Sequence, residues 1–265
     1  AWVEPTDVDL TNDAGNRSAR QLSTGEVLTI GDIEKMSKSK KNVVDPDQII
    51  RDYGADTARW FMLSDSPPER DLEWTEAGVT GAWRFQQRLH RIAMTALEQV
   101  PPAGTAKPAK FSEAATALRR AAHKTIAGLS ADIEAFHFNK AVARLYEFAN
   151  TIDAVKATDE STRWALREAL EIFVRLIGPM TPHLAEELWH SLGHTSLLAD
   201  APWPLPEDAL LVDDTVKGLM SSGEIAKIYA KWFMSPVPPK GLNLNMPMSD
   251  EMKALYKAPN DKAFE

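Results

Sequence analysis

The sequence predicts a mainly α-helical protein in which a short β-containing region precedes a helical bundle. Residues 26–30 are rich in β-branched side chains and follow residues 11–23, which are rich in Thr, Asn, Asp, Gly and Ser. This combination is typical of strands joined by turns. Farther along the chain, apolar residues recur at helical spacing, which predicts two amphipathic helices. These residues are Phe138, Val142, Leu145, Ala149 and Ile152 in one segment, and Leu166, Leu170, Phe173 and Ile177 in the other.

Capping residues mark the expected ends of further helices. Asp45 precedes a proline and predicts a helix start, with Gln48 at the capping-box position and Gly54 as the stop. Thr75 is expected to cap a longer helix, which ends at a linker over residues 101–110 that is rich in Pro, Ala, Lys and Gly. A domain boundary is therefore expected just before Thr75.

Composition excludes several classes of protein. The chain has 265 residues, 44% of them hydrophobic, which is enough for one or two globular domains. A net charge of -8 argues against nucleic-acid binding through bulk electrostatics, so any RNA contact is expected from local basic rows. The absence of cysteine excludes thiolate metal sites and cysteine nucleophiles. We expect neither an export signal nor a membrane-spanning segment.

A lysine- and serine-rich segment is the strongest chemical signal. Its residues are Lys35, Met36, Ser37, Lys38 and Ser39, followed by Lys40, Lys41 and Asn42. Ammonium and hydroxyl groups on a loop can bind polyphosphate oxygens, where negative charge develops as pyrophosphate leaves. By itself, the segment could equally be a solvated charge cluster.

The surrounding sequence favours the phosphate-binding interpretation. Residues 35–74 resemble the KMSKS region of class I aminoacyl-tRNA synthetases, and in particular of the leucyl-tRNA synthetases. The words GADT at residues 54–57 and SPPERDLEW at residues 66–74 carry this resemblance, because the valine and isoleucine enzymes differ there. The word GPMTPHLAEELW at residues 178–189 resembles the helical domain that all three enzymes share.

The resemblance covers roughly residues 1–213 and implies a division into domains. Residues 1–74 would be the end of the catalytic region, with the KMSKS loop and stem-contact helices, and residues 75–213 an anticodon-binding-type helical domain. The implied function is that of a leucine–tRNA ligase, which activates leucine with ATP and transfers it to tRNA in the cytoplasm. The family is usually monomeric, and the oligomeric state of this chain is left open. The HIGH motif, the leucine pocket and the editing domain are missing, so we expect the chain alone to be inactive.

The resemblance also implies roles for the loop residues. Lys38 would stabilise the transition state of leucyl-adenylate formation, with Lys35 as a second catalytic residue. ATP would be bound by Lys35, Met36, Ser37, Lys38 and Ser39. ATP with Mg²⁺ would be a substrate of the intact parent, and no tightly bound cofactor is expected in this chain.

Two rows of basic residues are candidate tRNA contacts. The first is Arg84, Arg88 and Arg91, and the second, weaker row is Arg119, Arg120 and Lys124. At helical spacing, three cations along one flank can meet successive phosphates. The alternative is a solvated face whose arginine stems cover the edge of the core.

No metal site is expected. His183, Glu187 and His190 share one face of a predicted helix. However, one helix supplies them all without second-shell partners, and the matching family segment is structural, so packing and capping account for them.

The C-terminal residues differ from the rest. Residues 214–265 resemble the C-terminal end of periplasmic glutamate/aspartate-binding proteins of ABC transporters, notably in KWF at 231–233 and SDEMKAL at 249–255. We therefore interpret the chain as a chimera with a foreign tail that packs poorly on the bundle. Two other functions stay open: a noncatalytic tRNA-binding module, and, from the tail alone, an amino-acid-binding transport protein.

Overall fold

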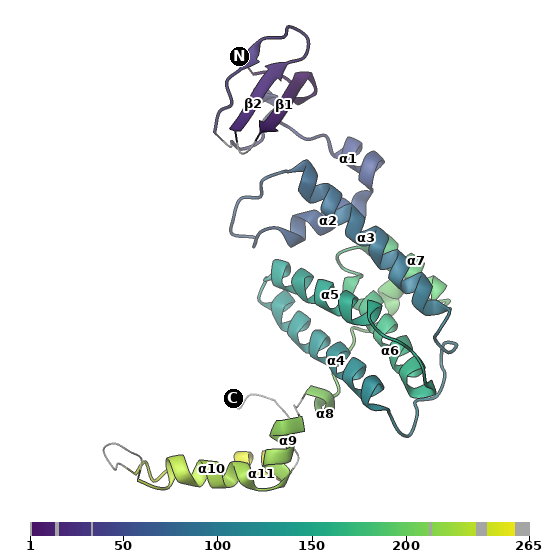
Figure 1. Cartoon of the computed structure of the whole chain (residues 1–265), viewed down its shortest axis with the longest axis vertical. Helices are drawn as coiled ribbons and strands as arrows, with labels where there is room; N and C mark the ends of the chain where they lie inside the picture. Colours follow the sequence, from purple (N-terminus) through teal and green to yellow (C-terminus); the bar gives the residue numbers. More distant parts are fainter. Residues whose placement is uncertain (1, 14–15, 33, 212–213, 237–242, 258–265) are drawn as a thin grey trace.

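The computed structural model describes residues 2–13, 16–32, 34–211, 214–236 and 243–257. Three parts follow one another along the long axis of the molecule: a small β-sheet, a body of packed helices, and a group of C-terminal helices that projects from the body (Figure 1). The prediction of a mainly helical protein with a short β-containing region is confirmed.

The sheet has three antiparallel strands in the order β1 (Val8–Asp13), β2 (Asn16–Gln21) and β3 (Val27–Leu28). A 3-10 helix, η1 (Pro5–Asp7), precedes it. The Asp7 carboxylate accepts hydrogen bonds from the Ser23 hydroxyl at 2.6 Å and the Gln21 amide at 2.7 Å. These bonds close the turn after β2 and lower the pKa of Asp7. The strand expected at residues 26–30 is confirmed as the shorter β3.

Two short helices connect the sheet to the body. They are α1 (Pro46–Tyr53) and α2 (Ala55–Ser64). Asp45 caps α1 as expected, accepting from the Asp47 amide at 3.0 Å, and Gly54 ends it with a φ of 85°. The capping-box prediction for Gln48 is wrong, because its side chain bonds Asp52 and Arg51 instead.

Five helices build the body. They are α3 (Glu76–Leu97), α4 (Glu113–Glu134), α5 (Phe138–Asp153), α6 (Glu160–Ile177) and α7 (Pro182–Ser191). Thr75 caps α3 as expected. Asp159 caps α6 by accepting from the Thr162 amide at 2.9 Å, and it also accepts from the hydroxyl of Ser112, the cap of α4, at 3.2 Å. This cluster joins the starts of α4 and α6, and its hydroxyl and amide donors hold the pKa of Asp159 far below the usual range.

The hydrophobic core continues across the boundary expected before Thr75. Trp60 and Phe61 of α2 are buried in the same cluster as the apolar faces of α3 to α7. The Trp60 indole lies 5.1 Å from the Phe85 ring, centroid to centroid, and its Nε1 donates to the Tyr146 hydroxyl at 3.3 Å. The core of the helical body therefore includes side chains of α2, although the division at residue 74 stays a prediction about domains.

The chain leaves the body through η3 (Leu198–Asp200) and α8 (Asp208–Leu211), and continues into α9 (Asp214–Ser221), α10 (Glu224–Phe233) and α11 (Asp250–Lys257). Of these last three helices, α9 contacts both α10 and α11, and no residue of α10 is buried. Trp232 of α10 is 50% exposed. Among the described residues, no helix has both the length and the apolar character needed to cross a membrane.

Candidate functional site

The lysine-rich segment forms a compact loop that ends in the 3-10 helix η2 (Lys38–Lys40). Asn42 closes this loop: its Oδ1 accepts from the Ser37 amide at 2.8 Å, and its Nδ2 donates to the Lys35 carbonyl at 3.4 Å. Lys41 takes the left-handed conformation, with a φ of 54°, and so turns the chain after η2. The sequence pattern gave no sign of this closing role of Asn42.

The four lysines of the loop differ in their surroundings. Lys40 is paired with Glu34, and Lys41 lies 3.6 Å from Glu4. Lys35 and Lys38 are exposed. The loop therefore presents two ammonium groups to solvent from a backbone that Asn42 holds in place.

The hydroxyls of the loop lie between these cations in sequence. The Oγ atoms of Ser37 and Ser39 are 3.2 Å apart, and Met36 is 43% exposed. Two adjacent hydroxyls and two flanking ammonium groups are suited to the oxygens of a polyphosphate, since both are hydrogen-bond donors to anions.

The first row of arginines is divided by its contacts. Arg84 and Arg91 are exposed on α3. Arg88 instead reaches α5, where its Nη1 donates to Asn150 at 2.7 Å and its Nη2 pairs with Asp153 at 2.8 Å. Arg88 therefore joins two helices, which leaves Arg84 and Arg91 as the accessible cations of this row.

The surroundings of Arg119 favour a structural role over the predicted tRNA contact. Its side chain is 4% exposed and forms a bidentate pair with Glu168, with Nε at 2.7 Å and Nη2 at 3.1 Å from the carboxylate oxygens. Nη2 also lies 2.6 Å from Glu207, and the guanidinium covers the rings of Phe111 and Trp164. Sequence spacing could not show this, because both carboxylates are distant along the chain.

The same cluster brings together residues that can ligate metals. One ligand atom from each of His123, Glu168 and Glu207 lies within 4.8 Å of the others. The Nδ1 of His123 accepts from the Glu207 backbone amide at 2.9 Å, so its proton is on Nε2, which lies 3.6 Å from Glu168. Because Arg119 pairs with both carboxylates and Lys107 also pairs with Glu207, we interpret the cluster as an ion-pair network that holds the segment before α8 on α4 and α6.

The rest of the second basic row is more accessible. Arg120 is partly buried and Lys124 is exposed. Lys124 borders a shallow hollow between α4 and α5 together with Arg144 and Glu147. The Arg144 guanidinium lies over Gly128, where a Cβ would come within 2.6 Å of it, and pairs with Asp132 at 2.6 Å.

Of the three α7 residues considered as metal ligands, His183, Glu187 and His190, the first contacts a buried carboxylate. His183 Nδ1 lies 2.8 Å from one oxygen of the buried Asp56, whose other oxygen accepts from the Leu184 amide at 2.9 Å. Asp56 therefore bonds the first turn of α7, where a carboxylate is favourable, and fixes α2 against it.

Comparisons with known proteins show similarity to two families along the chain. Residues 10–75 match the family described as tRNA synthetases class I (I, L, M and V), and residues 115–231 match the anticodon-binding domain of tRNA ligase. The part of the helical body from α4 onward is thus similar to the anticodon-binding domain of tRNA ligase. The match to this domain reaches residue 231, which lies beyond the start at 214 that the sequence predicts for the tail.

The curated relatives that this chain matches include leucine–tRNA ligases. The chain is 53% identical over 215 residues to that of Parvibaculum lavamentivorans and 56% identical over 216 residues to that of Paramagnetospirillum magneticum. These matches cover 81% and 82% of this chain, but only 25% and 24% of the two relatives. The chain thus spans about a quarter of the length of the relatives it matches.

A solved structure shares the fold. It is the LeuRS-tRNA-LeuAMS ternary complex of Agrobacterium radiobacter K84, with a TM-score of 0.60 and 28% sequence identity. The match covers 67% of this chain and 23% of that one. The prediction of the tail as part of a solute-binding protein stays a prediction.

Proposed function

We propose that this chain is the part of a leucine–tRNA ligase that supplies the KMSKS loop and the tRNA-binding helices. The observation that carries the proposal is the identity of 53–56% to two leucine–tRNA ligases over about four fifths of the chain. The fold shared with a LeuRS solved as a complex with tRNA supports it. A cytoplasmic location belongs to the same proposal.

The loop would act on ATP in the intact ligase. Lys38 and Lys35 would bind the phosphate oxygens, and the hydroxyls of Ser37 and Ser39 would orient them. The exposure of both lysines and the closure of the loop by Asn42 support these roles, because donors held in place stabilise charge that develops in a transition state. The loop presents donors rather than carboxylates, so Mg²⁺ would be held by the phosphates of ATP and by residues outside this loop.

The helical body would bind the phosphate backbone of leucine tRNA. Arg84 and Arg91 on α3, and Lys124 on α4, are the exposed cations that we assign to this contact. Local cations of this kind can bind RNA despite the net charge of -8, because phosphate contacts act at short range in physiological salt.

Two assays on the 265-residue chain test the proposal. Filter binding with a leucine tRNA transcript should show a complex, whereas leucine-dependent ATP–pyrophosphate exchange should stay at background. Adding a polypeptide with the nucleotide-binding half of a leucine–tRNA ligase should restore exchange, since the loop then faces an oriented substrate. Binding of tRNA without restored exchange would favour a noncatalytic tRNA-binding module, and glutamate binding in a calorimeter would favour the transport alternative.

A further inference from the structure

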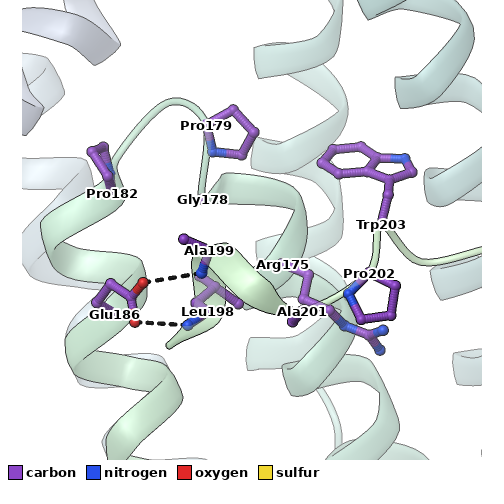
Figure 2. Close-up of a pocket in the computed structure, with 10 residues that line it drawn as sticks. All are labelled: Arg175, Gly178, Pro179, Pro182, Glu186, Leu198, Ala199, Ala201, Pro202 and Trp203. Atoms are coloured by element: carbon purple, nitrogen blue, oxygen red, sulfur yellow. Dashed lines mark hydrogen bonds between the residues drawn. The ribbon is translucent and has the colours of Figure 1, made fainter. Parts of the chain in front are cut away.

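A cavity beside the C-terminal end of α6 is lined mainly by apolar groups. Its volume is about 290 Å³, and it lies between the loop that joins α6 to α7 and the segment that follows η3. Figure 2 shows lining side chains: Pro179 comes from the loop, Pro182 begins α7, Pro202 and Trp203 come from the segment, and Arg175 extends from α6.

The walls of the cavity are held in place. The Glu186 carboxylate accepts from the Leu198 amide at 2.9 Å and the Ala199 amide at 3.1 Å, which fixes the start of the segment on α7 (Figure 2). Trp203 Nε1 donates to the Ser130 hydroxyl of α4 at 2.9 Å, although the side chain is 36% exposed. The exposed indole therefore has a set orientation, which reduces the entropy cost of stacking a ligand on it.

The guanidinium of Arg175 is only partly used by the protein. Its Nε donates to the Glu171 carbonyl at 3.1 Å, and among the described residues it forms no salt bridge. Burial lowers the pKa of Arg175 more than the charges of Glu171 and Glu168 raise it. Its other nitrogens are donors available to an anion in or beside the cavity.

A second guanidinium lies at the edge of the same cavity. The Nη2 of Arg59 on α2 donates to the carbonyl of Pro179 at 3.2 Å, and the side chain is exposed. The one carboxylate in the lining, Glu186, bonds backbone amides, so its charge is partly compensated. The cavity thus has mainly apolar walls, one oriented aromatic ring and one cation in its lining, with a second cation bonded to the Pro179 carbonyl.

We propose that this cavity binds one unstacked nucleotide of the RNA, with its base on Trp203 and a flanking phosphate on Arg175. The inference rests on the tRNA binding proposed above. RNA-binding proteins bind unstacked bases on aromatic rings and use arginine for the adjoining phosphates. The volume of about 290 Å³ suits one base rather than a stack of two.

The chain offers matched controls for the two central residues. Arg163 is also an exposed arginine of α6, about 18 Å from Arg175 at 1.5 Å per residue. Trp232 is an exposed indole of α10, outside the cavity. Trp203→Phe keeps an aromatic ring and loses the bond to Ser130.

The experiment is filter binding of a leucine tRNA transcript to the full chain and its variants over a series of salt concentrations. Trp203→Ala should weaken binding by about five- to tenfold, the lower range for loss of one stacked base, and Trp203→Phe by less. Arg175→Gln should reduce the salt slope by roughly 0.7 to 0.9, the value for one phosphate contact, and Arg175→Lys should restore most of that slope. Arg163→Gln and Trp232→Ala should bind like the unmodified chain.

A second measurement separates contact from folding. Ultraviolet cross-linking of the complex followed by mass spectrometry should recover the peptide that bears Trp203, joined to a nucleotide. If Trp203→Ala and Arg175→Gln both bind tRNA with an affinity within twofold of the unmodified chain, this proposal alone is overturned. Failure of the unmodified chain to bind tRNA would overturn the proposed function and, with it, the assignment of this cavity to RNA. A cross-link confined to other peptides would place the RNA elsewhere.

Discussion

The substitution Arg119→Met tests whether the second basic row serves the fold or the RNA. Arg119 is 4% exposed, and its guanidinium is within 3.1 Å of both oxygens of Glu168. Methionine fills much of the same space but leaves the Glu168 carboxylate, whose side chain is 16% exposed, without its main counter-charge. Removing one partner of a buried ion pair costs roughly 3 to 5 kcal/mol. Because Glu207, the other partner, is 42% exposed and can be solvated, we take the lower end, about 3 kcal/mol.

Urea denaturation followed by circular dichroism at pH 7 measures this cost. A loss of about 3 kcal/mol corresponds to roughly 6 to 12 °C in Tm for a chain of this size. Lys124→Met, on the same helix but exposed, should change the free energy of unfolding by less than about 0.5 kcal/mol. The double variant Arg119→Met, Glu168→Leu should recover part of the loss, because both charges are then gone.

The pH dependence provides an independent check on the same pair. Burial raises the pKa of Glu168, but the nearby His123 ring and the hydrogen bonds and charge of Arg119 together lower it below its usual value. A carboxylate with a lowered folded-state pKa contributes stability above its unfolded pKa of about 4.3, and this stability is lost as the pH falls through the folded pKa. The difference in the free energy of unfolding between Arg119→Met and the unmodified chain should therefore become smaller below about pH 4.3. The reasoning is refuted if Arg119→Met is as stable as the unmodified chain at pH 7 but lowers the salt slope of tRNA binding.

Three further outcomes are expected. In a ligase restored with its nucleotide-binding half, Lys38→Ala should lower the rate of adenylate formation by roughly 100- to 1,000-fold and leave Tm nearly unchanged. Lys40→Ala removes the partner of Glu34 and should lower this rate less. Equal losses of rate would contradict the assigned roles. Trp60→Ala should lower the free energy of unfolding by about 3 to 5 kcal/mol, and the whole helical body should still unfold in one cooperative transition. A separate early unfolding transition would show that α2 folds independently. Limited proteolysis should cut first within residues 214–240 and leave a stable helical fragment, and a tail as resistant as the body would contradict the prediction that it packs poorly.

The helices of the body could be predicted because their signals are local. The caps Asp45 and Thr75, the stop at Gly54 and the apolar faces of α5 and α6 depend on residues within a few turns of each other, and the structure has each of them. Local signals did not show that α2 belongs to the core. The burial of Trp60 depends on Phe85 and Tyr146, which lie on other helices.

The site residues divide in the same way. The lysine loop could be found from its sequence, since the chemistry is concentrated in consecutive residues. The ion pairs of Arg88 and Arg119 could not be predicted from sequence, because only the packing of helices brings Asp153 and Glu168 to them. Basic residues at helical spacing are equally compatible with an RNA contact and with a buried ion pair, and only the tertiary fold decides between them.

The central claim, that this chain carries the tRNA-binding helices of a leucine–tRNA ligase, is tested most directly by the salt dependence of leucine tRNA binding. The exposed Arg84 and Arg91 should each contribute about 0.9 to the slope of log K against log salt, so Arg84→Gln and Arg91→Gln should each reduce it by that amount. Arg88→Gln should leave the slope unchanged and lower stability instead, since Arg88 pairs with Asp153. A complex with this pattern of slopes is the result that we predict. Absence of a complex at 50 mM salt, or a slope that none of the three substitutions changes, would contradict the account.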